Sequence, residues 1–490
     1  MNIINSDSTT NVWSMILSCF YCLLKGCRQA FTLTISLVFV AHLHAESIID
    51  VYQQALQSDP EYLAAIEQHG ASSEVYIQAR SLLLPSLDLV GSYTKTRQNI
   101  NSSDNEVFAS GKTSYPTQDY ELAFNMSIYS FSHWAGFDKA KAEIQLLDVE
   151  LQAVRQDLIE RVAERYFATL AANENFEAIK AEKKAVAKQY ELAKEKGTKL
   201  GRKTDLLDAE ARFYQVESRE IELRNRLQIA LQQLRELTGT VPATLTLMGE
   251  SFELVSPEPN DPEQILQMAI ASNPEIKASR HAVEVANQAL RQDKGQHYPT
   301  VDLALRFNNS ETEGTLFGGG SNVDTADIAV SLNIPLYSGG AVSSKVRAST
   351  RLLIRAQQQL EMQTRRVQTD TFSAYDGIVA AIAKVNALAK SVASHEQSVE
   401  ARQEESRAGL VPTIALLDAE RDLFFARVEY ANARYDYVLN TLRLKRVVGS
   451  LSDADLAFVD SLLTGEDADL AALTYYKSAS MNRVAANNNQ

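Results

Sequence analysis

The run of residues 326–340 alternates apolar and polar side chains, which predicts a β-strand with one apolar and one polar face. Gly339 and Gly340 then turn the chain, and no proline follows until Pro412, so one very long helix is expected from about residue 341 to residue 408. A strand that leads directly into such a helix is unusual in a soluble domain. The apolar positions of this strand are Ile328, Val330, Leu332, Ile334 and Leu336.

The same unit occurs in the first half of the chain, which indicates an internal duplication. Pro60 and Pro274 each begin a predicted helix, and Pro85 and Pro299 each end it 25 residues later (85 − 60 = 299 − 274 = 25). A displacement of 214 residues (274 − 60 = 214) indicates a duplicated domain-sized unit rather than a solenoid repeat. Each half is expected to contain helices, two strands and a long helical hairpin.

The predicted boundaries follow from these breaks. They are a signal peptide at 1–45; a first repeat at 46–250, with strands at about 86–97 and 118–131 and a helical hairpin at 132–238; a second repeat at 251–449, with strands at about 300–308 and 326–337 and a hairpin at 341–448; and a partly disordered tail at 450–490.

The leader has the features of a secretory signal. Lys25 and Arg28 precede an apolar run at 30–40, and cleavage is expected after Ala45. Met1 and Met15 both remain possible starts. All three cysteines lie in this leader, so the expected mature chain has no thiol chemistry.

Composition excludes several functions. The formal net charge of −14 disfavours a nucleic-acid partner. No nucleophile motif, phosphate-binding loop or metal-ligand spacing occurs after the leader, so we expect no catalytic residues, no metal site, no cofactor and no enzyme activity.

Each predicted hairpin carries apolar residues at alternating spacings of three and four, the pattern of coiled coils. In the first return helix this seam runs from Leu206 to Leu234, and Glu220 is its one polar residue. The motif 206–210 returns at 416–420.

Four strands cannot close a transmembrane barrel, because single-chain barrels begin at eight strands and open edges do not stay in lipid. Either several chains share one barrel, or the chain is a soluble periplasmic coiled-coil scaffold without a pore. The sequence pattern alone leaves both readings open.

With these motifs in this order, the chain resembles the TolC-type outer-membrane efflux proteins. The resemblance implies a fold that is mainly α with a β-barrel part: a homotrimer whose twelve-stranded barrel lies in the lipid of a Gram-negative outer membrane and continues into a periplasmic α-helical tube. It also implies a periplasmic adaptor and an inner-membrane pump of the RND, ABC or MFS type as partners. The substrate, whether drugs, amphiphiles or secreted proteins, stays open. The motifs are residues 51–55, 79–85, 334–340, 416–419 and 431–435.

The resemblance further implies a gate near the periplasmic end. Asp418 occupies the position of a pore-constricting carboxylate, whereas Ala415 stands where a second carboxylate is common, so one acidic ring is expected. Contacts between the hairpins are expected at Thr204, Asp205, Ser406 and Arg407, although the usual tyrosine and arginine partners are replaced by Ser406 and Val411.

The hairpin tips are expected to dock the adaptor. The residues that the resemblance assigns to the two tips are Lys199, Leu200, Gly201, Ala408, Gly409 and Leu410.

Overall fold

The computed structural model describes residues 46–101, 111–197, 203–249, 253–314, 319–408, 410, 413–465 and 467–470. The predicted signal peptide at 1–45 lies outside them. In chain order the elements are α2 (Ile48–Ser58), α3 (Pro60–Ser81), β1 (Ser86–Ile100), β2 (Gly111–Tyr129), α4 (Phe131–Gly197), α5 (Lys203–Thr238), β3 (Thr244–Thr246), α6 (Pro262–Ser272), α7 (Pro274–Gly295), β4 (Thr300–Thr312), β5 (Ser321–Asn333), α8 (Ala341–Arg407), α9 (Thr413–Val448), α10 (Asp453–Ser461) and β6 (Asp467–Asp469).

Both repeats contain a helix pair that is broken at a proline, at the places where the sequence predicts helix starts. Asp59 caps α3 by accepting a hydrogen bond from the backbone N–H of Tyr62 at 2.9 Å. Asn273 caps α7 in the same way, from the N–H of Ile276 at 2.9 Å. Proline follows each cap, where its fixed φ suits a first helical turn and its missing N–H costs nothing.

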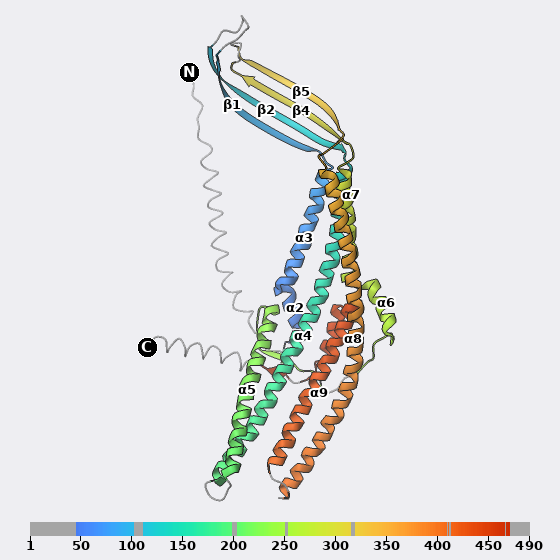
Figure 1. Ribbon diagram of the computed structural model, residues 1–490. Helices are drawn as coiled ribbons and strands as arrows, with labels where there is room; N and C mark the ends of the chain where they lie inside the picture. Colours follow the sequence, from blue (N-terminus) through green and yellow to red (C-terminus); the bar gives the residue numbers. More distant parts are fainter. Residues whose placement is uncertain are drawn as a thin grey trace, which may run out of the picture. The chain divides into compact units, whose positions relative to one another are not determined.

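The four long strands form one antiparallel sheet in the order β1-β2-β4-β5. The central pair, β2 with β4, joins the two repeats and places Phe124 opposite Leu305. Among the described residues, β1 and β5 each pair on one side, so the sheet has two open edges. Figure 1 shows this sheet at one end of the long helices.

All four strands run further toward the loops than predicted, and β2 and β5 end earlier than predicted on the helix side, whereas β1 and β4 begin at the predicted residues. The polar runs at about 98–117 and 308–325 are expected to be loops, but β2 begins at Gly111 and β5 at Ser321. Ladder hydrogen bonds join backbones and need no apolar side chain, so pairing continues into polar sequence. β5 ends at Asn333 rather than at 337 because Pro335 has no N–H to donate.

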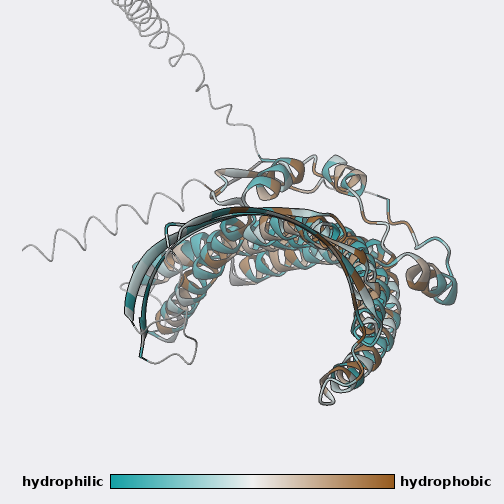
Figure 2. Ribbon diagram, turned by 90° about the horizontal axis from the view of Figure 1, so that it is seen from above, coloured by the Kyte–Doolittle hydropathy of each residue, from teal (hydrophilic) through white to brown (hydrophobic). Residues whose placement is uncertain are grey.

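Two long helical hairpins follow the strand pairs. Helices α4 and α8 each have 67 residues, and the return helices α5 and α9 each have 36. At about 1.5 Å per residue, α4 and α8 are roughly 100 Å long. Each long helix packs against its own return helix, and α7 packs against both α4 and α8. Seen from above, strands and helices follow one curved arc (Figure 2).

The main core lies where α2 and β3 pack across α4, α5 and α9. The hydroxyl of Tyr166 donates a hydrogen bond to the carbonyl oxygen of Thr246 at 2.9 Å, which anchors the β3 segment on α4. Fully buried side chains in this core include Tyr52, Tyr166, Phe167, Leu158, Leu234 and Leu245.

The one polar residue on the first return seam, Glu220, is buried and paired. It accepts a hydrogen bond from Nζ of Lys183 at 2.7 Å and also contacts Arg224. Burial raises the pKa of Glu220, but the bonds from Lys183 and the charge of Arg224 outweigh it, so the pKa lies below its usual value. The buried carboxylate of Glu220 therefore stays ionised because Lys183 and Arg224 pair with it.

The first part of the tail at 450–490, which is predicted to be partly disordered, is folded. Helix α10 buries Leu456, and β6 pairs with β3, where Leu470 is fully buried. This short acidic segment folds because its apolar side chains cover the core next to α2 and β3 of the first repeat. Residues 471–490 lie outside the described residues.

The end of α9 depends on a glycine, which gives a test of this packing. Gly449 has φ of +83°, and a Cβ there would lie 2.6 Å from the carbonyl oxygen of Ser272. We expect Gly449→Ala to destabilise the protein by about 1–3 kcal/mol, measured as a lower Tm in detergent. Gly70→Ala, in α3 with no atom within 4 Å of its Cβ, should leave Tm unchanged or raise it. Equal losses for both variants would contradict this reading.

Candidate gate and the contacts between the helical hairpins

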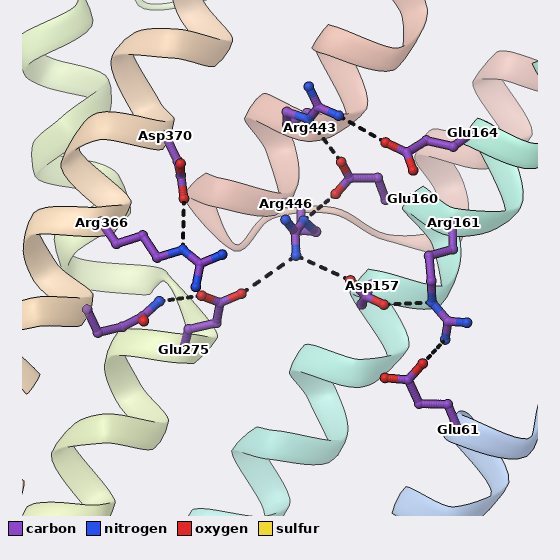
Figure 3. Close-up of polar contacts among 11 residues, drawn as sticks. Glu61, Asp157, Glu160, Arg161, Glu164, Glu275, Arg366, Asp370, Arg443 and Arg446 are labelled. Atoms are coloured by element: carbon purple, nitrogen blue, oxygen red, sulfur yellow. Dashed lines mark hydrogen bonds and ion pairs between the residues drawn. The ribbon is translucent and has the colours of Figure 1, made fainter. Parts of the chain in front are cut away.

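The two hairpins of the chain meet along α4 and α9, and their contact begins with a charged network. Arg446 of α9 lies 3.4 Å from a carboxylate oxygen of Asp157 and 3.6 Å from one of Glu275, and it also forms an ion pair with Glu160. Figure 3 shows Arg446 at the centre of these carboxylates. One arginine therefore ties α9 to both α4 and α7.

A second arginine strengthens the same contact. Arg443 donates to Glu160 at 3.1 Å and to Glu164 at 2.9 Å, both on α4. Glu160 is buried, with 8% of its side chain exposed. Its desolvated charge is stabilised because two guanidinium groups reach it, and loss of either would leave a poorly compensated buried charge.

The network extends outward to the first helix pair. Arg161 of α4 donates to Asp59 at 3.0 and 3.2 Å and to Asp157 at 2.7 Å, and it lies 3.4 Å from Glu61. Since Asp59 is also the cap of α3, the start of that helix is held onto α4. This level of the hairpins is therefore cross-linked over four helices: α3, α4, α7 and α9.

Further toward the tips, the contact between α4 and α9 becomes sparser. The hydroxyl of Tyr435 donates to Glu174 at 2.7 Å, and its ring stacks on Phe167 with centroids 5.1 Å apart. Burial raises the pKa of Glu174 and also that of Tyr435. Along this contact the residue numbers increase on α4 and decrease on α9, so the two helices run antiparallel. Acidic residues on α4 face basic and phenolic residues on α9.

Asp418, the expected gate carboxylate, is in the second turn of α9 and is paired. It accepts a short contact from Arg212 of α5 and lies 3.3 Å from Arg421 of its own helix. Its side chain is 40% exposed. The expectation of one acidic ring treats this carboxylate as free, whereas the structure places it between two arginines. Ala415, one turn earlier, supplies no second carboxylate.

The structure describes the side chains of three of the four residues that are expected to join the hairpins. Thr204 is exposed near the start of α5, and Arg407 donates to Glu404 of its own helix at 2.5 Å. Ser406 is half-buried at the end of α8, and the side chain of Asp205 is outside the described residues. Side chains of α5 instead reach α9 from Arg212, seven residues after Asp205, which contacts Asp418. The sequence signal for it was its heptad spacing from that position.

The tips are described only in part. Lys199, Leu200, Gly201 and Gly409 lie outside the described residues. Ala408 is exposed, and Leu410 has 76% of its surface exposed while its N–H donates to the carbonyl oxygen of Glu405 at 2.9 Å. The second tip thus presents a large apolar side chain to solvent.

Within the described ranges, no group of three or more His, Cys, Asp or Glu side chains is placed to hold a metal ion. The charged side chains described above are paired with one another. What they can do chemically is hold helices together and set the local charge.

This chain is similar in sequence and in fold to known outer membrane proteins. The TolC outer membrane protein of Vibrio cholerae is 30% identical over 420 residues, which cover 85% of this chain and 94% of that protein. The alkaline protease secretion protein AprF of Pseudomonas aeruginosa is 29% identical over 422 residues, covering 85% and 87%. The crystal structure of the Campylobacter jejuni outer membrane channel CmeC aligns with a TM-score of 0.72 at 16% identity, covering 86% and 89%.

A family model described as "Outer membrane efflux protein" matches residues 51–240 and 265–450, which are the two repeats seen in the structure. The match spans most of the chain and both helical hairpins. This chain therefore belongs to the outer membrane efflux protein family.

Proposed function

We propose that three copies of this chain assemble side by side, so that their sheets close into one barrel of twelve strands (3 × 4 = 12) and their hairpins continue it as a periplasmic tube. As a member of its family, the chain is a protein of the outer membrane and forms a duct for efflux or type I secretion. The three-fold assembly, the domain boundaries given above and the partners are part of the proposal.

The observation that carries the proposal is a sheet with two open edges and one exposed apolar face. Side chains of that face are far more exposed than a water-soluble sheet tolerates: Ile328 is 80% and Leu89 is 75% exposed. Lipid covers such a face, but it cannot satisfy the N–H and C=O groups at the edges of β1 and β5. Pairing β5 of one copy with β1 of the next satisfies both constraints.

The strands are also long enough to cross a membrane. They have 13 to 19 residues, and about 9–11 residues of a tilted strand cross a membrane. Helix α8 contains an 18-residue stretch that could cross a membrane by length and composition alone, but α7 and α9 pack along this helix. The strands are therefore the membrane-crossing elements in this proposal. A soluble scaffold would leave the apolar sheet face in water.

The hairpin tips are the proposed docking site for a periplasmic adaptor linked to an inner-membrane pump. Leu410 supports this assignment because it is an exposed apolar residue that follows the end of α8, and the other end of this helix is the one next to β5. The names of the relatives include both secretion of a protease and efflux, so this chain is proposed to serve whichever substrate its pump delivers. Asp418, a few residues beyond the second tip, is the proposed constriction residue.

The barrel face gives the first test of the proposal. Ile328→Lys places a charge on the apolar face of β5, and at mid-membrane depth this costs about 2–4 kcal/mol per copy. We expect loss of membrane-inserted protein, measured by fractionation and resistance of the assembled form to detergent. Ala329→Lys, the neighbouring position on the opposite face, is the matched control and should insert normally. Equal insertion of the two variants would refute the lipid-facing assignment.

Assembly is the second test. Native mass measurement of the detergent-solubilised protein should give three chains per particle, because each sheet has two unpaired edges. A stable monomer would leave those edges unsatisfied and would overturn the shared barrel.

Docking is the third test. Leu410→Glu should abolish export while leaving assembly and insertion intact, since it changes only an exposed tip side chain. Gln403→Glu adds the same charge two turns earlier on an exposed face of α8 and should export normally. Full export by Leu410→Glu would remove this residue from the docking surface.

A further inference from the structure

The two return helices, α5 and α9, touch through a pair of arginines with regular spacing. Arg212 contacts Asp418, and the guanidinium of Arg219 lies 5.8 Å from the ring centroid of Phe425. Both contacts have the same offset (418 − 212 = 425 − 219 = 206), so the helices run parallel here and meet once per seven residues. Two arginines of α5 therefore dock α9 in one fixed register.

Arg212 is the principal partner of the Asp418 carboxylate. Arg421 is also within reach of it at 3.3 Å, but its guanidinium is committed to Asp422, with donor–acceptor distances of 2.6 and 3.0 Å. That bond to Asp422 is the largest cause of the raised pKa of Arg421. Arg212 is the less exposed of the two arginines, at 22% against 32%.

A third helix contributes to the same cluster. Glu182 of α4 faces these arginines, and burial raises the pKa of its carboxyl despite the opposing charges of Arg421 and Arg212. The charged groups that meet at this level are three acids and three bases from α4, α5 and α9. They are Glu182, Asp418, Asp422, Arg212, Arg219 and Arg421.

We propose that Arg212 sets the charge of the constriction by holding the carboxylate of Asp418, so that the narrow end of the duct carries little net negative charge and binds cations weakly. This inference rests on the proposed function, in which three copies of Asp418 surround the pore axis. Arg212 is a positioning residue that acts through Asp418.

The pairing changes the electrostatic potential at the constriction, as a comparison with a ring of unpaired Asp418 carboxylates shows. Three unpaired carboxylates around a narrow axis repel one another and concentrate cations, as acidic rings in cation channels do. Pairing each one with a guanidinium removes most of that field. Separation of α5 from α9 would release it, so the charge of the constriction is coupled to the contact between the hairpins.

The test uses a local probe of electrostatic potential. The chain has no cysteine after residue 45, so Ala415→Cys, one turn before Asp418, introduces a single half-exposed thiol. The purified trimer is treated with a cationic and an anionic methanethiosulfonate reagent, and the ratio of the two reaction rates is measured. Arg212→Gln in this background should raise the ratio of cationic to anionic rates by about tenfold, because it frees nearby negative charge.

Two further variants identify the charge that is freed. Adding Asp418→Asn to Arg212→Gln should return the ratio to near the value of the background. Arg226→Gln removes the same charge from the same helix, at an exposed pair with Glu222, and should leave the ratio unchanged. In planar bilayers, Arg212→Gln should likewise strengthen block by La³⁺ from the hairpin side by about tenfold relative to Arg226→Gln.

The outcomes separate the inference from the proposed function. Equal ratios for Arg212→Gln and Arg226→Gln, or a raised ratio that Asp418→Asn does not reverse, would overturn the role of Arg212. A trimer that gives no conductance would overturn the proposed duct, while the thiol ratios would still decide whether Arg212 neutralises Asp418.

Discussion

The contact between α4 and α9 is the interaction on which the arrangement of the two helical hairpins depends, because it joins the long helix of the first hairpin to the return helix of the second. It is built from acidic residues on α4 and basic or phenolic residues on α9, in an antiparallel order from Asp157 and Arg446 to Glu174 and Tyr435. Buried carboxylates such as Glu160 are tolerated only because guanidinium groups reach them. The seam therefore specifies both the partner helix and its register.

This seam is uneven along its length, and the unevenness has a functional consequence. At the level of Arg446, four helices are joined through shared carboxylates (Figure 3). Toward the tips, the contacts reduce to Glu174 with Tyr435 and then to the cluster around Arg212 and Asp418. In the cluster near the tips, Arg212 and Asp418 are 22% and 40% exposed, whereas Glu160 at the level of Arg446 is 8% exposed. An ion pair that water reaches costs less to separate than a buried one, so the proposed gate lies at the end of the seam that opens more easily.

The sheet imposes the second constraint on the molecule. Because β2 pairs with β4, the two repeats are joined at the sheet as well as along α4 and α9, so each hairpin is held at two separate levels. In the proposed assembly, lipid covers the apolar face and further copies pair with the open edges of β1 and β5, which connects the fold of one chain to a pore.

Much of this was predictable from the sequence, because it depends on local pattern. The alternation in 326–340, the prolines at 60, 85, 274 and 299, and the absence of proline along the hairpins determine strands, helix starts and long helices through neighbouring residues alone. The strand ends were less predictable, since a ladder continues wherever a partner backbone lies opposite. Which part of the tail folds was likewise left open by the sequence, because the burial of 453–470 depends on β3 and on the core of the other elements.

The proposed gate residue, Asp418, shows which properties the sequence determines and which only the tertiary structure decides. The position of Asp418 in a return helix was predicted from the motif around it, but the partner of its carboxylate was not. Whether that carboxylate faces water, a cation or an arginine depends on which helix lies beside α9, and the answer is Arg212, 206 residues earlier (418 − 212 = 206). Helical periodicity shows which face of α5 is available to a neighbour. Only the packing of α5 against α9 in parallel register brings that guanidinium to the carboxylate.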